Sequence, residues 1–264
     1  MDLGLSGRVA IVTGASQGIG LATARLLAAE GAALVLCARD GGRLKAAAAG
    51  LEGEGARVIP VPGDILDPAL PDRLVSAAVE FGGGDILVNN VGGGSGHLGF
   101  ERLTDADWEI AYQLNVVAPA RLIRAVLPGM RQRGWGRVVN VASYTARVPE
   151  PFCLPYAAAK AALVNLTRGL ARTAAADGVL VNSVLPGLTA TDGVTEGFAT
   201  AVEATGRSTD DLLAAMLRRA PIDMGRMGDP AEVAALIAFL ASEQASWING
   251  AAYLIDGGTV RSAT

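Results

Sequence analysis

Short β-rich runs alternate with longer Ala- and Leu-rich stretches along almost the whole chain. This alternation predicts a parallel sheet covered by helices on both faces, because parallel strands need a long crossover between them. Runs such as 138–141 are almost continuously apolar, as in strands that are buried on both faces. The sequence therefore predicts one doubly wound α/β domain with a seven-stranded parallel sheet. We expect strands at residues 8–13, 33–39, 57–62, 86–90, 137–143, 180–185 and 252–255, and helices at 18–30, 42–52, 69–81, 105–133, 155–176 and 230–242.

The alternation is interrupted between residues 189 and 228. This stretch is polar, contains Gly and Thr, and includes one segment of helical pattern at 210–219. A connection of this length is usually functional, often as a lid over a site. We therefore expect residues 1–264 to form a single dinucleotide-binding catalytic domain with a substrate lid at about 188–228.

Composition excludes several classes of function. The chain has 22 Lys and Arg against 26 Asp and Glu and no basic run, so nucleic acid is not expected as a partner. A single His (His97) and two Cys (Cys37 and Cys153) cannot build a typical zinc site or a His-based triad, so no metal is expected. The N-terminus shows no cationic segment before an apolar run, and no apolar stretch is long enough to span a bilayer. We expect a soluble, cytoplasmic protein with no membrane partner.

Tyr156 and Lys160 form an unusual pair. Arg provides nearly all the cationic side chains, and the only lysines are Lys45 and Lys160. Spacing of four residues places Tyr156 and Lys160 on one helical face. A nearby ammonium favours the phenolate and lowers the phenol pKa from about 10, which makes Tyr a usable acid or base. An isolated pair of this spacing is more often a surface feature of a helix, so the remaining motifs decide its meaning.

A Gly-rich turn follows the first predicted strand directly. Its sequence is TGASQGIG at 13–20, and a predicted helix begins within it. Glycines at these positions permit a tight turn and allow a pyrophosphate to approach the backbone and the positive helix N-terminus. This order of strand, turn and helix predicts a Rossmann-type nucleotide site.

Together these motifs resemble the short-chain dehydrogenase/reductase family, in its 3-oxoacyl-acyl-carrier-protein-reductase-like branch. TGASQGIG at 13–20, Asp64, Asn89-Asn90-Val91-Gly92, Ser143, Tyr156 with Lys160, and Pro186-Gly187 occur in the family's order, and the match runs from about residue 5 to residue 258. Val91 departs from the usual Ala. The resemblance implies a catalytic tetrad of Asn115, Ser143, Tyr156 and Lys160. It also implies cofactor contacts from Gly14, Ser16, Gln17, Gly18, Ile19, Gly20, Arg39, Asp64, Ile65, Asn90, Gly92, Tyr156, Lys160, Pro186, Gly187, Thr189 and Thr191.

The resemblance gives each member of the tetrad a role. Tyr156 would exchange a proton with the substrate oxygen, and Ser143 would stabilise the developing alkoxide. Lys160 would hold the nicotinamide ribose and lower the pKa of Tyr156. Asn115 would hold a water that relays protons to Lys160; read alone, it is a polar residue on a long helix. Asp64 is also open to a second interpretation, as a turn residue after Gly63.

Cofactor choice falls, by family register, at Ala38 and Arg39. An acid there binds the ribose 2′-hydroxyl of NAD, whereas Arg accommodates the 2′-phosphate of NADP. Since Ala38 is not acidic, NADP(H) is favoured over NAD(H). Gln17 stands where NADP users of the family often carry a second basic residue. Alternatively, Arg39 is solvated and Asp40 only caps the next helix.

Substrate contacts are predicted from loop position at Thr145, Phe152 and Leu188. The loop that contains His97 is a further candidate. We expect a reductase of a ketone or a β-ketoacyl thioester. The alternatives are an NAD-dependent alcohol dehydrogenase of a small secondary alcohol and, remotely, a non-catalytic nucleotide-sensing protein. Family members usually form homotetramers, so the resemblance implies a homo-oligomer.

Overall fold

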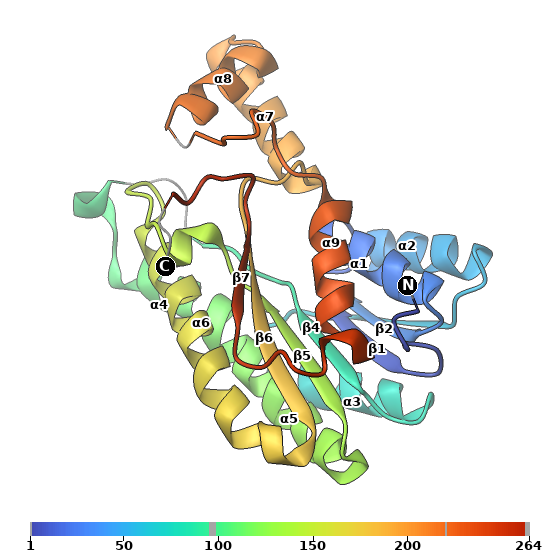
Figure 1. Ribbon diagram of the computed structural model, residues 1–264. Coiled ribbons are helices and arrows are strands. Elements are labelled where there is room, and N and C mark those ends of the chain that lie inside the picture. Colours follow the sequence, from blue (N-terminus) through green and yellow to red (C-terminus); the bar gives the residue numbers. More distant parts are fainter. Residues whose placement is uncertain (1, 95–98, 220, 262–264) are drawn as a thin grey trace.

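A parallel sheet of seven strands forms the centre of the computed structural model, which describes residues 2–94, 99–219 and 221–261. The strand order is β3-β2-β1-β4-β5-β6-β7, and helices cover both faces, as predicted (Figure 1). The strands are β1 (Val9–Thr13), β2 (Ala33–Ala38), β3 (Val58–Pro62), β4 (Ile86–Asn89), β5 (Gly136–Val141), β6 (Val179–Pro186) and β7 (Ala252–Ile255). The helices are α1 (Gly18–Ala29), α2 (Gly41–Gly53), α3 (Leu70–Val79), α4 (Asp105–Tyr112), α5 (Ala118–Arg133), α6 (Leu154–Ala174), α7 (Asp192–Thr205), α8 (Thr209–Arg219) and α9 (Pro230–Leu240).

The central strands are apolar throughout because both of their faces are covered. Consecutive residues of a strand point to opposite faces of the sheet. Thus Ala10 and Val12 of β1 belong to the apolar layer shared with α1, α2 and α9. Val9 and Ile11 belong to the opposite layer, shared with α3, α5 and the end of α6. All four side chains are buried, which is why the sequence of β1 shows no polar alternation.

The strand order reverses at β1, which pairs with β2 on one side and β4 on the other. In open parallel sheets, ligands bind outside the carboxyl ends of the strands at such a reversal. The Gly-rich turn follows β1, and residues 90–94 follow β4, so both segments lie at this edge. The fold therefore places the predicted nucleotide motif at the point where a ligand is expected.

The segment 188–228 carries two helices rather than the single predicted one. α8 corresponds to the expected 210–219, whereas α7 was not predicted. Both helices project beyond the carboxyl edge of the sheet (Figure 1). No residue of α7 is buried, so packing contributes little to its placement.

The predicted helix 105–133 contains a change of pitch. α4 begins with a capping box between Thr104 and Asp107, and a π-helical turn, Gln113–Val117, joins it to α5. Such turns occur often at functional sites. Here the turn carries Asn115, whose side chain is fully buried.

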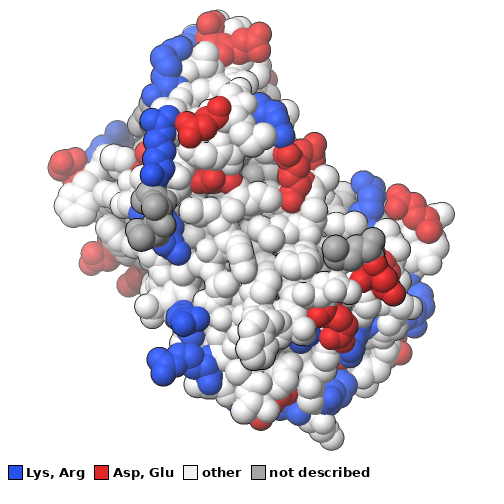
Figure 2. Space-filling view, in the orientation of Figure 1, with Lys and Arg blue, Asp and Glu red and all other residues white. Residues whose placement is uncertain are grey.

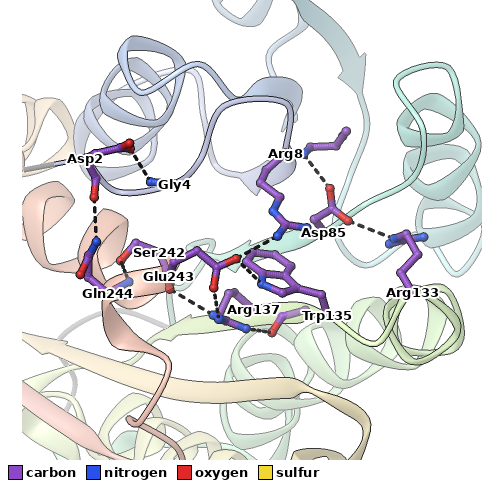
Figure 3. A network of polar contacts seen from close by, with 12 residues as sticks. Asp2, Gly4, Arg8, Asp85, Arg133, Trp135, Arg137, Ser242, Glu243 and Gln244 are labelled. Carbon is purple, nitrogen blue, oxygen red and sulfur yellow. Dashed lines mark hydrogen bonds and ion pairs between the residues drawn. The ribbon is translucent and has the colours of Figure 1, made fainter.

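A polar network closes the opposite edge of the sheet (Figure 3). Glu243 accepts hydrogen bonds from Arg8 Nη2 at 2.9 Å and from Trp135 Nε1 at 2.8 Å. The buried Arg137 lies 3.6 Å from Glu243, and its guanidinium is 4.3 Å from the centre of a Trp135 ring. These contacts join the start of β1, the start of β5 and the segment after α9.

Within the described ranges, no helix is long and apolar enough to cross a bilayer. The same residues contain no group of three or more His, Cys, Asp and Glu side chains that could hold a metal ion.

Candidate active site at the carboxyl edge of the sheet

The turn after β1 needs its glycines. Gly14 and Gly18 have φ values of +64° and +55°, in the left-handed region. A Cβ at Gly20 would lie 2.2 Å from the carbonyl oxygen of Gly14. Asn90 Nδ2 donates to the carbonyls of Thr13 (3.0 Å) and Gly14 (3.3 Å). Asn90, expected on the adenosine side, thus fastens the turn to the end of β4.

Two arginines follow β2, with Arg39 directly after the strand and Arg43 in the first turn of α2. Arg39 is exposed and has no hydrogen bond or ion pair with any described residue. Asp40 caps α2 by accepting a hydrogen bond from the Arg43 amide at 2.9 Å. The Arg43 guanidinium donates through Nη1 to Gln17 Oε1 at 2.7 Å and to Glu196 Oε1 at 3.0 Å. Sequence reasoning did not identify Arg43, whose only signal was its place one turn after Arg39.

Asp64 and Ile65 follow β3. Asp64 Oδ1 accepts a hydrogen bond from the Leu66 amide at 2.9 Å, which is the contact expected if Asp64 is a turn residue. The Ile65 side chain is buried. The same turn leaves the Asp64 carboxylate at the carboxyl edge of the sheet.

Asn115, Lys160 and Gly92 converge behind this edge. Asn115 Nδ2 donates to the carbonyls of Gly93 (2.6 Å) and Ala111 (2.7 Å), and its Oδ1 accepts from the Gly93 amide at 3.3 Å. A Cβ at Gly92 would lie 2.6 Å from Lys160 Nζ and 2.9 Å from Asn115 Oδ1. Only glycine fits there, and Asn115 holds the neighbouring backbone in place.

Lys160 and Tyr156 lie together on α6, with Nζ 5.6 Å from the centre of the phenol ring. Lys160 is 2% exposed and donates to the carbonyl of Val141 at 2.7 Å. Burial lowers the pKa of Lys160 to about 7. Burial also raises the pKa of Tyr156 to about 12, against a smaller lowering by a hydrogen bond with Ser143. The expected lowering of the Tyr156 pKa by Lys160 is therefore wrong for this structure, because burial of the phenol is the largest influence on its pKa and Lys160 is not among the groups that shift it.

Ser143 lies at the end of β5 and is buried. Its Oγ accepts hydrogen bonds from the Thr145 amide at 3.2 Å and the Thr145 Oγ1 at 2.9 Å. Thr145, expected to contact substrate, is itself buried and directed at Ser143. Tyr144 and Glu150, which sequence reasoning missed, meet nearby through a 3.4 Å hydrogen bond from the Tyr144 hydroxyl.

The segment after β6 reaches the Gly-rich turn. A Cβ at Gly18 would lie 3.2 Å from the Thr191 Cβ. Thr191 Oγ1 caps α7 by accepting from the Val194 amide at 3.4 Å, and Thr189 Oγ1 donates to the Gly187 carbonyl at 3.1 Å. Of the two predicted nicotinamide contacts, Thr191 thus lies beside the turn at the start of α1.

The remaining predicted residues are less informative. Ser16 and Ile19 lie within the turn, Phe152 and Leu188 are partly buried in loops, and Pro186 ends β6. His97 lies outside the described residues.

These residues fit a dinucleotide. Gly20 keeps the space beside the Gly14 carbonyl that a side chain would fill, and Arg39 offers an unpaired guanidinium at the end of β2. Lys160 presents a buried ammonium next to Gly92, with a single carbonyl acceptor among the described residues. Hydrogen-bond donors for phosphate and sugar groups therefore lie along one edge of the sheet.

Comparison with known proteins agrees with this geometry. A family model described as short chain dehydrogenase matches residues 8–201. The 3-oxoacyl-[acyl-carrier-protein] reductase FabG of Vibrio cholerae is 36% identical over 97% of this chain and 98% of its own. Cis-4-hydroxycyclohexanecarboxylate dehydrogenase of Sinomonas cyclohexanicum is 41% identical over 95% of this chain and 96% of its own. The crystal structure of L-sorbose reductase from Gluconobacter frateurii, complexed with NADPH and L-sorbose, superposes with a TM-score of 0.93 at 38% identity, covering 99% of this chain and 100% of that one.

Proposed function

Because the chain belongs to the short-chain dehydrogenase/reductase family, whose members act as oxidoreductases on carbonyl and CH–OH groups, we propose that it reduces a ketone with NADPH. The observation that carries the proposal is the meeting of three side chains at the carboxyl edge: Tyr156 lies next to Lys160 and hydrogen-bonds with Ser143, and Lys160 lies beside Gly92. We propose that the whole chain is one catalytic domain and that residues 188–228 cover its substrate.

In the proposed site, the turn at 13–20 holds the pyrophosphate, Arg39 the 2′-phosphate and Lys160 the nicotinamide ribose. Thr189 and Thr191 hold the carboxamide, while Asp64, Ile65 and Asn90 line the adenosine side. When bound, the cofactor supplies the hydride.

Tyr156 donates the proton to the carbonyl oxygen in this proposal. Its raised pKa keeps the phenol protonated near neutral pH, which suits a proton donor for reduction. Oxidation of an alcohol would start from the phenolate of the same residue.

Ser143 stabilises the developing negative charge on the same oxygen. A hydroxyl has one hydrogen to donate and two lone pairs to accept with. Thr145 satisfies both lone pairs of Ser143 Oγ, so the Ser143 hydrogen is left for donation. We assign Thr145 a positioning role on this ground. Asn115 is likewise a positioning residue, since it fixes the Gly93 backbone next to Lys160.

NADP(H) is favoured over NAD(H) because Arg39 has no partner among the described residues and position 38 is Ala rather than an acid. The NADPH in the L-sorbose reductase structure supports this preference by similarity. For the substrate, the relatives point to β-ketoacyl thioesters and to ketoses. The similarity to cis-4-hydroxycyclohexanecarboxylate dehydrogenase supports a second candidate, oxidation of a secondary alcohol.

We also propose a homo-oligomer. Apolar side chains line a groove between α5 and α6, and further ones are exposed on and before α4. Figure 2 shows a second broad area without charged side chains, over β7 and beside α9. The groove and the exposed residues on and before α4 are together the first of these two apolar areas. Its residues are Leu127, Leu166, Leu170, Phe100, Trp108 and Tyr112.

The test is the loss of reduced-nicotinamide absorbance with NADPH and with NADH. The substrates are a β-ketoacyl thioester, L-sorbose and 4-oxocyclohexanecarboxylate, and Tyr156→Phe is the control. We expect turnover with NADPH that falls by about 10²–10⁴-fold in the Phe variant, while cofactor binding stays. Equal turnover in the Phe variant, or no binding of either cofactor, refutes the proposal; binding without turnover across a wider ketone panel favours a nucleotide sensor.

A further inference from the structure

Two carboxylates of α7 contact the nucleotide motif and the start of the neighbouring helix α2. Asp192 Oδ2 accepts a hydrogen bond from the Gly18 amide at 2.9 Å, and Glu196 Oε1 accepts one from Arg43 Nη1 at 3.0 Å. The two acids are four residues apart, so they lie on one face of the helix. Since no α7 residue is buried, these polar contacts matter more for its position than apolar packing does.

Asp192 contacts the turn that the proposed function gives to the pyrophosphate, and Glu196 contacts Arg43, which lies beside that turn. Gly18 is the first residue of α1, where the pyrophosphate is placed by the proposal. Arg43 donates a hydrogen bond to Gln17 of the same Gly-rich turn. It follows Arg39 by four residues in the sequence. Gln17 occupies a position where NADP-dependent members of the family often have a second basic residue. Here the Gln17 amide oxygen accepts a hydrogen bond at 2.7 Å from the guanidinium of Arg43.

Nη1 of Arg43 is shared between Gln17 and Glu196, and Nε of the same guanidinium lies 3.6 Å from Asp40 Oδ2. Both members of the pair with Glu196 are more than half exposed, with side-chain exposures of 54% and 58%, so the pair is weak and exchangeable. A phosphate dianion pairs with a guanidinium more strongly than an exposed carboxylate does. The 2′-hydroxyl of NAD(H) carries no charge with which to compete.

We propose that Arg43 is a second determinant of cofactor choice. In this proposal the 2′-phosphate of NADP(H) forms an ion pair with Arg43 and replaces Glu196 as its partner. The exchange removes one of the two polar contacts of α7 described above. This inference rests on the proposed function. The pyrophosphate, common to both cofactors, displaces Asp192 from the Gly18 amide. Asp192 therefore opposes the binding of either cofactor, whereas Glu196 opposes only the cofactor that carries a 2′-phosphate.

The test is a set of dissociation constants for NADPH and NADH, measured by quenching of protein fluorescence on the full chain. Arg43→Gln should weaken NADPH binding by about tenfold and leave NADH binding within about twofold. Glu196→Gln should strengthen NADPH binding by about two- to fivefold without changing NADH binding. Asp192→Asn should strengthen binding of both cofactors by a similar factor.

Matched controls remove the same charges from the same helices. Lys45→Gln on α2 and Glu203→Gln on α7 change exposed residues that make no contact with Arg43. We expect both controls to bind the two cofactors as the native chain does. Circular dichroism spectra and thermal midpoints, compared across all variants, identify any variant that has lost its fold.

Two results overturn the inference. One is an Arg43→Gln variant with an unchanged ratio of NADPH to NADH affinity; the other is a Glu196→Gln variant that behaves like Glu203→Gln. Either leaves the proposed function intact, because the native chain still binds NADPH. Failure of the native chain to bind either cofactor refutes the proposed function itself and is seen before any variant is made.

Discussion

At the scale of single residues, the direction of one hydroxyl depends on Thr145. The Thr145→Val variant keeps the shape of the side chain but removes the donor to Ser143 Oγ. We expect kcat to fall by about tenfold with little change in the Kd for cofactor, because Ser143 is no longer held as a donor. Steady-state kinetics check this expectation. Thr145→Ser, which restores the hydroxyl, should recover most of the rate; a Val variant as fast as the native chain would exclude the positioning role.

Lys160 gives the stability of the folded chain a dependence on pH. Its pKa is about 7 in the folded state and near the ordinary 10.5 in the unfolded state. Between these values the unfolded chain binds more protons, so the free energy of unfolding rises with pH across this window. From pH 7 to pH 9 we expect the native chain to gain about 2 kcal/mol relative to Lys160→Met.

Urea unfolding at several pH values measures this difference. The comparison stops at pH 9, because deprotonation of Tyr156, whose folded pKa is raised, acts in the opposite sense above pH 10. Parallel curves for the native chain and Lys160→Met would show that Lys160 stays charged in the folded state. The same variant should lose turnover.

At the scale of elements, two helical glycines test the role of the turn. Gly20→Ala places a Cβ 2.2 Å from the Gly14 carbonyl, whereas a Cβ at Gly50 of α2 meets nothing within 4 Å. We expect Gly20→Ala to lower the free energy of unfolding by about 2–4 kcal/mol and to abolish cofactor binding. Gly50→Ala should raise the same free energy by about 0.5–1 kcal/mol. Chemical denaturation measures the free energy of unfolding of both variants. If Gly20→Ala were as stable as Gly50→Ala, the turn would have relaxed around the added methyl group.

The elements also show what sequence reasoning can and cannot predict. The strands and most helices were predicted to within a few residues, because apolar runs and Ala-rich stretches report burial directly. α7 was missed because its sequence contains Gly193 and Gly197 and buries nothing, so its pattern resembles a loop. The π-turn at Asn115 depends on contacts with Gly93 from another element, which no local pattern reveals. The pKa of Tyr156 was misjudged for a related reason, since desolvation depends on the whole surroundings.

At the scale of the whole molecule, Glu243 joins segments that are far apart in the chain. It faces Arg8, Trp135 and the buried Arg137 (Figure 3). Removing its carboxylate leaves the Arg137 charge with only carbonyl acceptors in a poorly solvated position. We expect Glu243→Ala to lower the free energy of unfolding by about 2 kcal/mol without changing cofactor affinity.

Urea denaturation and a cofactor titration check this prediction together. Glu203→Ala, on the exposed face of α7, is the control for loss of a carboxylate and should unfold like the native chain. A Glu243→Ala variant as stable as this control would mean that the carbonyls of Gly136 and Ser242 satisfy Arg137 on their own.

The packing of α1 against α9 also has a consequence for the growing polypeptide. Leu27 and Ala24 of α1 belong to the same apolar cluster as Val233 and Ile237 of α9, and the two helices pack against each other. At about 5–20 residues per second, a ribosome completes α9 roughly 10–40 s after α1. During that interval the α1 face lacks the α9 side chains that pack on it in the folded chain. Chaperones that recognise such faces should bind this protein during its synthesis and release it once α9 has emerged.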